Sequence, residues 1–214
     1  MRVTITFDNT PPVRKGLLSD WGFSALVEVT TSHKLLFDTG GNGRILLNNM
    51  EILGIDPSSI QDIFISHPHL DHTGGLSSFL KRNRAVKVWA PPSFTEDIHV
   101  KEIKFLSKPA KLYEDVYSTG ELDGIEQSLV VETSKGLIII AGCSHPAMES
   151  ILAAASGFGE VYGIIGGLHS TPPEALAGLR LICATHCTQE IARIKLLYPH
   201  AFLEGGAGQV IEVS

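Results

Sequence analysis

The chain has 214 residues, of which 43% are hydrophobic and 19% are charged, and its formal net charge is -6. These values predict a single globular domain over residues 1–214 and exclude a disordered chain. The acidic balance argues against a general nucleic-acid-binding protein, which normally carries a basic face. No apolar run approaches the ~20 residues of a membrane-spanning helix, and the strand-like first seven residues lack a signal-peptide core. We therefore expect a cytoplasmic protein with neither nucleic acid nor membrane as a partner.

Hydrophobic patterning divides the first half of the chain into short strands and helices. Alternating or continuous apolar residues predict strands, and apolar residues at helical spacing predict helices, the first of which ends at Gly54. The strands are expected at residues 1–7, 21–29, 34–37, 62–65 and 86–90, and the helices at 44–53 and 76–81. The strands at 21–29 and 34–37 would form a hairpin that turns at Thr31, Ser32 and His33.

Asp38 follows the strand at 34–37 and directly precedes Thr39, Gly40 and Gly41. From a strand end, a carboxylate can accept a hydrogen bond from a metal-binding histidine and so orient that ring. An aspartate in this position can equally cap its own turn. Both roles stay open for Asp38 on the sequence alone.

The loop after the strand at 62–65 carries the densest group of candidate metal ligands. Within six positions stand His67, His69, Asp71 and His72. Imidazole nitrogens and carboxylate oxygens are the usual ligands of zinc, iron and manganese. Pro68 restricts the backbone between the first two histidines, so that both rings can point at one ion. The adjacent Asp71 and His72 cannot easily reach the same ion as that pair, which indicates a second metal.

In the second half of the chain, several apolar strands end in a histidine. Strands are expected at residues 111–117, 128–132, 137–141, 161–165, 181–185, 201–203 and 209–213, and helices at 146–155 and 188–197. His145, His169 and His186 each follow one of these strands within a few residues. Strand ends of layered α/β sheets gather along one edge, where sites are built. The two hairpin-rich halves predict two β-layers that face each other with helices outside.

The three cysteines, Cys143, Cys183 and Cys187, do not form the pattern of a disulfide framework. We expect buried thiols, with core packing for Cys183. Cys187 follows His186 and can approach the metal site without binding. A metal-binding role for Cys183 and Cys187 is the weaker alternative, because their thiolates would compete with the histidine-rich set for one site.

The motif His67-x-His69-x-Asp71-His72, followed by Thr73-Gly74-Gly75, resembles the signature of the metallo-β-lactamase superfamily. Phe37-Asp38-Thr39-Gly40 and the later strand-end histidines resemble other motifs of that superfamily in the same order, over essentially the whole chain. The resemblance implies a four-layer αββα sandwich with a binuclear site at one edge. It implies two divalent metal ions as cofactors. Zinc is the ion that the histidine-dominated ligands suit best, and manganese and iron are the alternatives.

Three later segments are similar to a branch named for 7,8-dihydropterin-6-methyl-4-(β-D-ribofuranosyl)aminobenzene 5'-phosphate synthase. They are Gly142-Cys143-Ser144-His145-Pro146, Gly166-Gly167-Leu168-His169 and Ala184-Thr185-His186-Cys187-Thr188. In most members of the superfamily an aspartate bridges the metals from the strand end that here carries Gly142 to His145, where this chain has no carboxylate. We expect His145 to be the replacement ligand.

Motif order and strand-end placement assign His67, His69 and His145 to one metal, and Asp71, His72 and His186 to the other. A water or hydroxide between the ions would be the nucleophile, since coordination can lower its pKa from ~15.7 to about 7. Asp71 would orient this water or accept its proton. His169 is open between a substrate-phosphate contact, a general acid for the leaving group, an alternative ligand and a buried histidine with no role in the site.

The expected function is hydrolysis of a small ester, phosphoester or lactone, on a small-molecule substrate that can carry a phosphate. A synthase-type transfer on a pterin-like phosphate is the alternative that the branch implies, and a non-catalytic metal-binding module is a third. A di-iron redox protein fits less well, because such relatives use carboxylate-rich ligands and usually an attached flavin domain. A nuclease fits poorly with the acidic balance.

Overall fold

The structure, a computed structural model, describes residues 1–30 and 33–214. Within these residues the first sheet has seven strands, in the spatial order β13 (Val210–Glu212), β1 (Arg2–Phe7), β2 (Ser24–Thr30), β3 (His33–Phe37), β4 (Asp62–Phe64), β5 (Lys87–Ala90) and β6 (Glu102–Phe105). The described strands of the second sheet are, in spatial order, β12 (Leu181–Thr185), β11 (Val161–Gly167), β10 (Gly136–Ala141), β9 (Leu129–Thr133), β8 (Val116–Ser118) and β7 (Ala110–Tyr113).

The main core lies between the two sheets. Val3, Phe37 and Phe64 of the first sheet and Ile138 and Ile165 of the second are fully buried there. Because side chains alternate along a strand, the residues between them point to the outer faces, where they form a second apolar surface on each sheet. Both faces of the central strands are covered, and this is why the strands appear in the sequence as continuous apolar runs.

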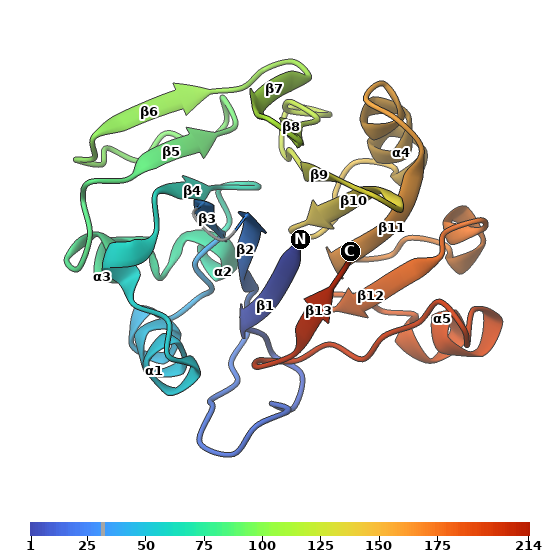
Figure 1. Cartoon of the computed structure of the whole chain (residues 1–214), viewed down its shortest axis with the longest axis horizontal. Helices are drawn as coiled ribbons and strands as arrows, with labels where there is room; N and C mark the ends of the chain where they lie inside the picture. The colour runs from blue at the N-terminus through green and yellow to red at the C-terminus, as the bar shows by residue number, and fades with distance from the viewer. Residues whose placement is uncertain (31–32) are drawn as a thin grey trace.

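The described part of the chain has five α-helices, most of which cover the outer faces of the two sheets. They are α1 (Gly43–Leu53), α2 (Leu70–Thr73), α3 (Leu76–Leu80), α4 (Met148–Ser156) and α5 (Ile191–Leu197), with short 3-10 turns η1 (Pro57–Ser59) and η2 (Pro173–Leu176). Met50 of α1 and Phe79 of α3 pack on the first sheet, and Ile151 of α4 and Ile194 of α5 pack on the second. Figure 1 shows α1 and α3 on one side of the sheets and α4 and α5 on the opposite side. The predicted four-layer αββα sandwich is confirmed.

Parallel pairing places the ends of several strands at the same edge. β3, β4, β5 and β6 run parallel in the first sheet, and β10, β11 and β12 run parallel in the second. The carboxyl ends of these strands therefore lie together, as expected for the edge that carries a site. None of the described helices is both long enough and apolar enough to cross a lipid bilayer.

The structure corrects two of the expected strands. Residues 111–117 were expected as one strand, but the chain forms β7 and β8 there, because Asp115 turns it with a φ of 61°. Residues 201–203 form only a single bridge, between Ile182 and Phe202. The strand β6 is not among the strands expected from the sequence.

The helix starts also differ from the prediction. The helix expected from residue 146 begins at Met148, and the one expected from residue 188 begins at Ile191. The end of α1 is confirmed, since Gly54 adopts a left-handed conformation with a φ of 72°. The hairpin turn expected at Thr31 and Ser32 lies outside the described residues.

Candidate metal centre

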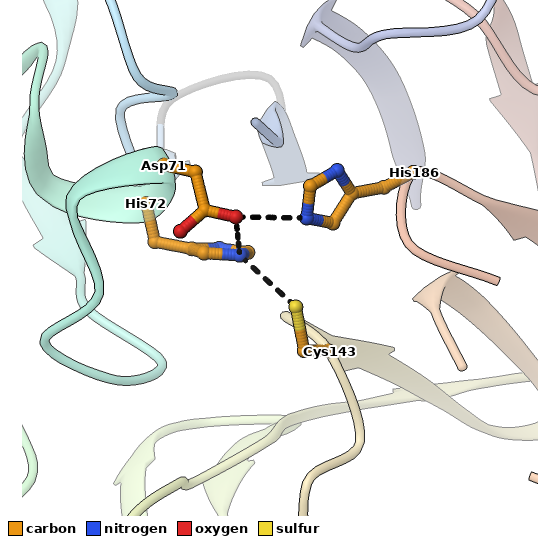
Figure 2. A group of neighbouring side chains, drawn as sticks. All are labelled: Asp71, His72, Cys143 and His186. Atoms are coloured by element: carbon orange, nitrogen blue, oxygen red, sulfur yellow. Dashed lines mark hydrogen bonds and ion pairs between the residues drawn. The ribbon is translucent and has the colours of Figure 1, made fainter. Parts of the chain in front are cut away.

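Four strands of the sandwich end in loops that carry the predicted ligands. β4 leads into the loop and the short helix α2 with the HxHxDH motif, and β10, β11 and β12 lead toward His145, His169 and His186. β4 belongs to the first sheet and the other three strands belong to the second. The sheets face each other, so side chains from both converge in one region, and Figure 2 shows part of it.

One cluster consists of His67, His69 and His145, and we call it the three-histidine cluster. One ring nitrogen of each residue lies within 4.8 Å of the other two. The ring centroids are 4.6 Å apart for His67 and His69, and that of His145 lies 4.8 Å from both. His67 is buried and His69 is exposed, so the cluster reaches from the interior to the protein surface.

The other cluster consists of Asp71, His72, Cys143 and His186, and we call it the Asp-His-Cys-His cluster. Its donor atoms also lie within 4.8 Å of one another. Nε2 of His72 lies 3.2 Å from Cys143 Sγ and 3.6 Å from Asp71 Oδ2, and Nε2 of His186 lies 3.4 Å from the same oxygen (Figure 2). The ring centroids of His67 and His72 are 4.1 Å apart, so the two clusters adjoin.

Hydrogen bonds at the far nitrogen of two rings determine which nitrogen faces the Asp-His-Cys-His cluster. Nδ1–H of His72 donates to Asp38 Oδ2 at 2.8 Å. Nδ1–H of His186 donates to Asn9 Oδ1 at 2.7 Å. With the proton on Nδ1, each ring presents the lone pair of Nε2 to the other donors, as metal-binding histidines do.

The same arrangement holds for His67. The Ser66 hydroxyl donates to Asp38 Oδ2 at 2.6 Å, so its oxygen accepts from His67 Nδ1–H at 2.9 Å. Among the described residues, Nε2 of His67, His145 and His186 is buried without a hydrogen-bond partner. A buried polar atom left unpaired costs about 1–3 kcal/mol, which a bound metal ion would offset. The donor set therefore fits two divalent ions.

Burial and mutual repulsion favour the neutral form of the three-histidine cluster. Burial and the neighbouring imidazoles lower the pKa of His67 far below its usual range and that of His145 to about 4. Burial alone would raise the pKa of Asp71, but the contact of its carboxylate with His186 and the electrostatic effect of His72 hold this pKa below its usual range. At neutral pH these groups are in the protonation states that bind metal ions.

One donor of the Asp-His-Cys-His cluster, the thiol of Cys143, holds a proton that a metal ion would displace. Burial opposes the charged form of His72, but the Asp38 carboxylate outweighs burial and raises the pKa of His72. Contact with the Cys187 thiol, together with burial, raises the pKa of Cys143. Because a coordinating thiol is deprotonated outright, metal binding at this cluster is expected to release a proton.

The structure brings together the six predicted ligands and divides them as the sequence assigns them to two metals. Their role as ligands stays a prediction. Asp38 is fully buried and bonds to Ser66 and His72, an arrangement that suits orientation of a ligand better than capping of a turn. His169 lies outside both clusters, with its ring centroid 5.2 Å from that of His145.

Cys143 is a candidate ligand that the sequence prediction missed. It was expected as a buried thiol, with His145 in place of the missing carboxylate. The structure places His145 in one cluster and Cys143 in the other. A thiolate is anionic like a carboxylate, so Cys143 is the closer chemical substitute, and its position at the end of β10 was the available signal. Cys183 lies in the core, and Cys187 Sγ lies 3.8 Å from the Cys143 carbonyl oxygen, beside the site.

Gly142 allows the two ligand loops to touch. A Cβ atom there would lie 2.2 Å from Ser66 Oγ and 3.0 Å from His67 Nδ1. Gly142→Ala is therefore expected to lower the free energy of unfolding by about 1–3 kcal/mol and to weaken metal binding, as urea denaturation and metal analysis would show. In the control Gly157→Ala, the added Cβ would lie 3.3 Å from Ala154 O and should leave metal content unchanged. Normal metal content in Gly142→Ala would show that the close approach does not matter for the site.

Comparisons with known proteins identify the family of this chain. Residues 22–155, which include the HxHxDH motif and Cys143, match the family model of the metallo-beta-lactamase superfamily. The curated 7,8-dihydropterin-6-methyl-4-(beta-D-ribofuranosyl)-aminobenzene-5'-phosphate synthase of Methanocaldococcus jannaschii is 29% identical, over 79% of this chain and 81% of its own length.

Two solved structures extend the similarity to the whole chain. Tm1679, a metal-dependent hydrolase of the beta-lactamase superfamily, is 26% identical with a TM-score of 0.80, over 100% of this chain and 99% of its own. The metallo-beta-lactamase fold protein YhfI from Bacillus subtilis shares the fold at 12% identity with a TM-score of 0.72, over 99% of each chain. With both clusters at the strand ends and a family model that matches well over half of its length, this chain belongs to the metallo-beta-lactamase superfamily.

Proposed function

We propose that this protein is a metal-dependent hydrolase of a small ester, phosphoester or lactone. The observation that carries the proposal is an open cluster of three histidines beside a four-donor cluster. Catalytic zinc sites keep three protein ligands and leave a fourth position for water or substrate, whereas sites with four protein ligands are closed. The three-histidine cluster matches the open type. The 26% identity to a metal-dependent hydrolase over the full chain supports the same class.

Two divalent ions bound at these clusters would supply Lewis-acid polarisation of the substrate and a water of lowered pKa. His69 is exposed, so the substrate would approach from its side of the site. One carboxylate oxygen of Asp71 faces both His72 and His186 (Figure 2). We assign the other oxygen to the attacking water, which it would orient or whose proton it would accept.

Apolar side chains border the site on its exposed side. Trp21 is 56% exposed, and its ring centroid lies 5.1 Å from that of His186. Leu70, between His69 and Asp71 in the chain, is 76% exposed. Ligand sites combine apolar and aromatic surfaces with a few polar groups that fix the orientation of the ligand. We therefore expect the part of the substrate that does not react to contact Trp21.

Zinc is the ion that these donors favour. Thiolates and imidazoles suit zinc, whereas manganese prefers carboxylate, carbonyl and water oxygens. Cys143 adds a soft sulfur donor to the Asp-His-Cys-His cluster, which strengthens the preference for zinc over manganese. Iron is the remaining alternative, since it binds the same atoms.

Metal analysis of protein purified without added metal, paired with a screen of phosphoester and lactone substrates, tests the proposal. We expect about two zinc ions per chain and turnover of at least one of these substrate classes. Fewer metal ions would contradict the binuclear centre. Two metal ions without any turnover would indicate a non-catalytic metal-binding module.

A synthase-type transfer on a pterin-like phosphate is the second candidate. The 29% identity to the Methanocaldococcus jannaschii synthase over 79% of this chain favours it. Metal content does not separate the two functions, because both would use the same clusters. Isotopically labelled water does: label in the product indicates hydrolysis, and transfer of the group to a second organic substrate without label indicates the synthase reaction.

His169→Ala is expected to keep its metal ions and to lose turnover by about 10²–10⁴-fold, the range for removal of a general acid or base. His169 lies outside both clusters but beside His145, with a left-handed φ of 43° and with its carbonyl oxygen bound by Gln189 N–H at 2.9 Å. His145→Ala is the paired variant and should lose a metal ion. Loss of a metal ion from His169→Ala would make His169 a ligand, and unchanged turnover would exclude it from the chemistry.

A further inference from the structure

Glu126 is a buried carboxylate, 1% exposed, that binds the backbone of one ligand loop. Its Oε1 accepts hydrogen bonds from the N–H groups of Gly142, Cys143 and Ser144 at 3.0, 3.0 and 3.1 Å, and its Oε2 accepts from His145 N–H at 2.9 Å. Successive N–H groups that converge on one anion form a nest, a backbone arrangement typical of anion sites. Here the anion in the nest is a side chain of the same protein.

The loop in this nest supplies one donor to each cluster. Cys143 belongs to the Asp-His-Cys-His cluster and His145 to the three-histidine cluster. Between them, Ser144 adopts a left-handed φ of 57°, and its hydroxyl donates to Gly167 O at 2.8 Å. The same carboxylate thus binds the N–H groups of both donor residues.

The next residue, Gln127, binds the other ligand loop. Its N–H donates to Ser66 O at 2.9 Å, and its Nε2 donates to Ile65 O at 2.8 Å. The Ser118 hydroxyl donates to Gln127 Oε1 at 2.7 Å, which fixes the orientation of the amide. Ile65 and Ser66 directly precede His67. Two adjacent residues therefore connect the end of β4 in the first sheet to the end of β10 in the second.

The charge of Glu126 suits a site for cations. Its Oε2 lies 4.0 Å from His67 Nδ1, and burial of a charge without compensation is costly. Burial raises the pKa of Glu126, and the N–H groups of His145, Cys143 and Ser144 oppose this shift because they stabilise the carboxylate. An uncharged side chain could also accept hydrogen bonds from these backbone N–H groups. A carboxylate at this position therefore favours a role in metal binding.

We propose that Glu126 is a positioning residue that sets the spacing and the affinity of the two metal sites through the loop at residues 142–145. The inference rests on the proposed metal centre. Glu126 acts through Cys143 and His145, since its carboxylate binds their backbone and leaves their side chains free to face the metals.

The test compares Glu126→Gln with the wild-type protein after loading with cobalt(II). Glutamine keeps the shape of the glutamate side chain, but it removes the carboxylate and turns an NH₂ group toward the N–H donors of the nest. We expect the affinity for cobalt, measured by competition with a chelator, to fall by about 10–100-fold, the usual effect of removing a group that orients ligands. The absorption spectrum of the bound cobalt should change as well. Glu121→Gln is the control, because Glu121 accepts from Ser93 N–H at 2.8 Å in a different loop, and it should change neither quantity.

The cobalt spectrum separates positioning from a general loss of stability, because it reports the geometry of the ligands in folded protein. If Glu126→Gln does not fold, Glu126→Asp takes its place, since it keeps the charge and shortens the side chain by one methylene. Wild-type affinity and spectrum in a folded Glu126 variant would overturn the inference and leave the metal centre standing. A wild-type protein that binds no cobalt would overturn the proposed function itself.

Discussion

Cys143→Ala is expected to lower the metal content from about two ions per chain to about one. Cys143 Sγ lies 3.2 Å from His72 Nε2, at the strand end where the superfamily resemblance implies a carboxylate. Without the thiol, Asp71, His72 and His186 would have to hold the ion alone. Loss of an outer group that orients a ligand costs about 10–100-fold in metal affinity, so the loss of a direct ligand should cost more. Elemental analysis and chelator competition measure the effect.

The two other cysteines are matched controls for this prediction. Cys183→Ala removes a thiol from the core between the sheets, and Cys187→Ala removes one beside the site. Both variants should keep two metal ions. In cobalt-loaded protein, the thiolate-to-cobalt absorption should disappear only in Cys143→Ala. If this absorption disappeared in Cys187→Ala instead, Cys187 would be the ligand. If the wild-type protein showed no such absorption, neither thiol would be a ligand.

The strands that the sequence predicts best are the ones covered on both faces. β9, β10, β11 and β12 consist mainly of apolar residues, and the structure buries them as expected. The prediction fails where a turn lacks a clear marker. Residues 111–117 continue a strand-like pattern without glycine or proline, yet Asp115 adopts a left-handed conformation and divides them into β7 and β8. Aspartate tolerates this conformation better than most residues, but its presence alone is a weak signal.

Contacts distant in sequence set the start of α4. Pro146 suits the first turn of a helix, and the sequence therefore predicts a helix from that residue. The helix begins at Met148, because the N–H of His145 is bound to Glu126 and the preceding loop is held in the nest. The helix propensity of Pro146 cannot reveal that the Glu126 carboxylate, 19 residues before His145 in the chain, accepts the hydrogen bond of His145 N–H.

Candidate ligands were easier to predict than the residues that orient them. His67, His69 and their neighbours form a local motif, and the later histidines each follow an apolar strand. Asn9 bonds to His186 over a separation of 177 residues, and no local pattern marks it. Cys143 was missed for a different reason: a buried structural thiol and a thiolate ligand look alike in sequence, and only the surrounding side chains separate them.

Asp38→Asn is expected to lower the affinity of the Asp-His-Cys-His cluster for metal by about 10–100-fold. Asp38 accepts from Ser66 N–H at 2.8 Å, from the Ser66 hydroxyl at 2.6 Å and from His72 Nδ1–H at 2.8 Å. Asparagine offers one oxygen in place of two. If that oxygen faces Ser66 N–H, the NH₂ group faces His72, whose proton must then move to Nε2 and block the metal. In the flipped orientation of the amide, the NH₂ group faces Ser66 N–H. Two donors then face each other, which displaces the loop that carries His67.

Asp62→Asn is the matched control, because Asp62 is also a buried aspartate next to a histidine. Its Oδ2 lies 2.7 Å from His33 Nε2, and its Oδ1 accepts from Tyr113 OH and Trp89 Nε1–H. It stands at the start of β4, the opposite end from the ligand loop, so its loss should reduce stability and leave metal affinity unchanged. Because both variants remove the charge of a buried aspartate that contacts a histidine, the difference between them isolates the effect of orienting a ligand. Equal metal affinities in the two variants would contradict that role and leave Asp38 a stabilising group only.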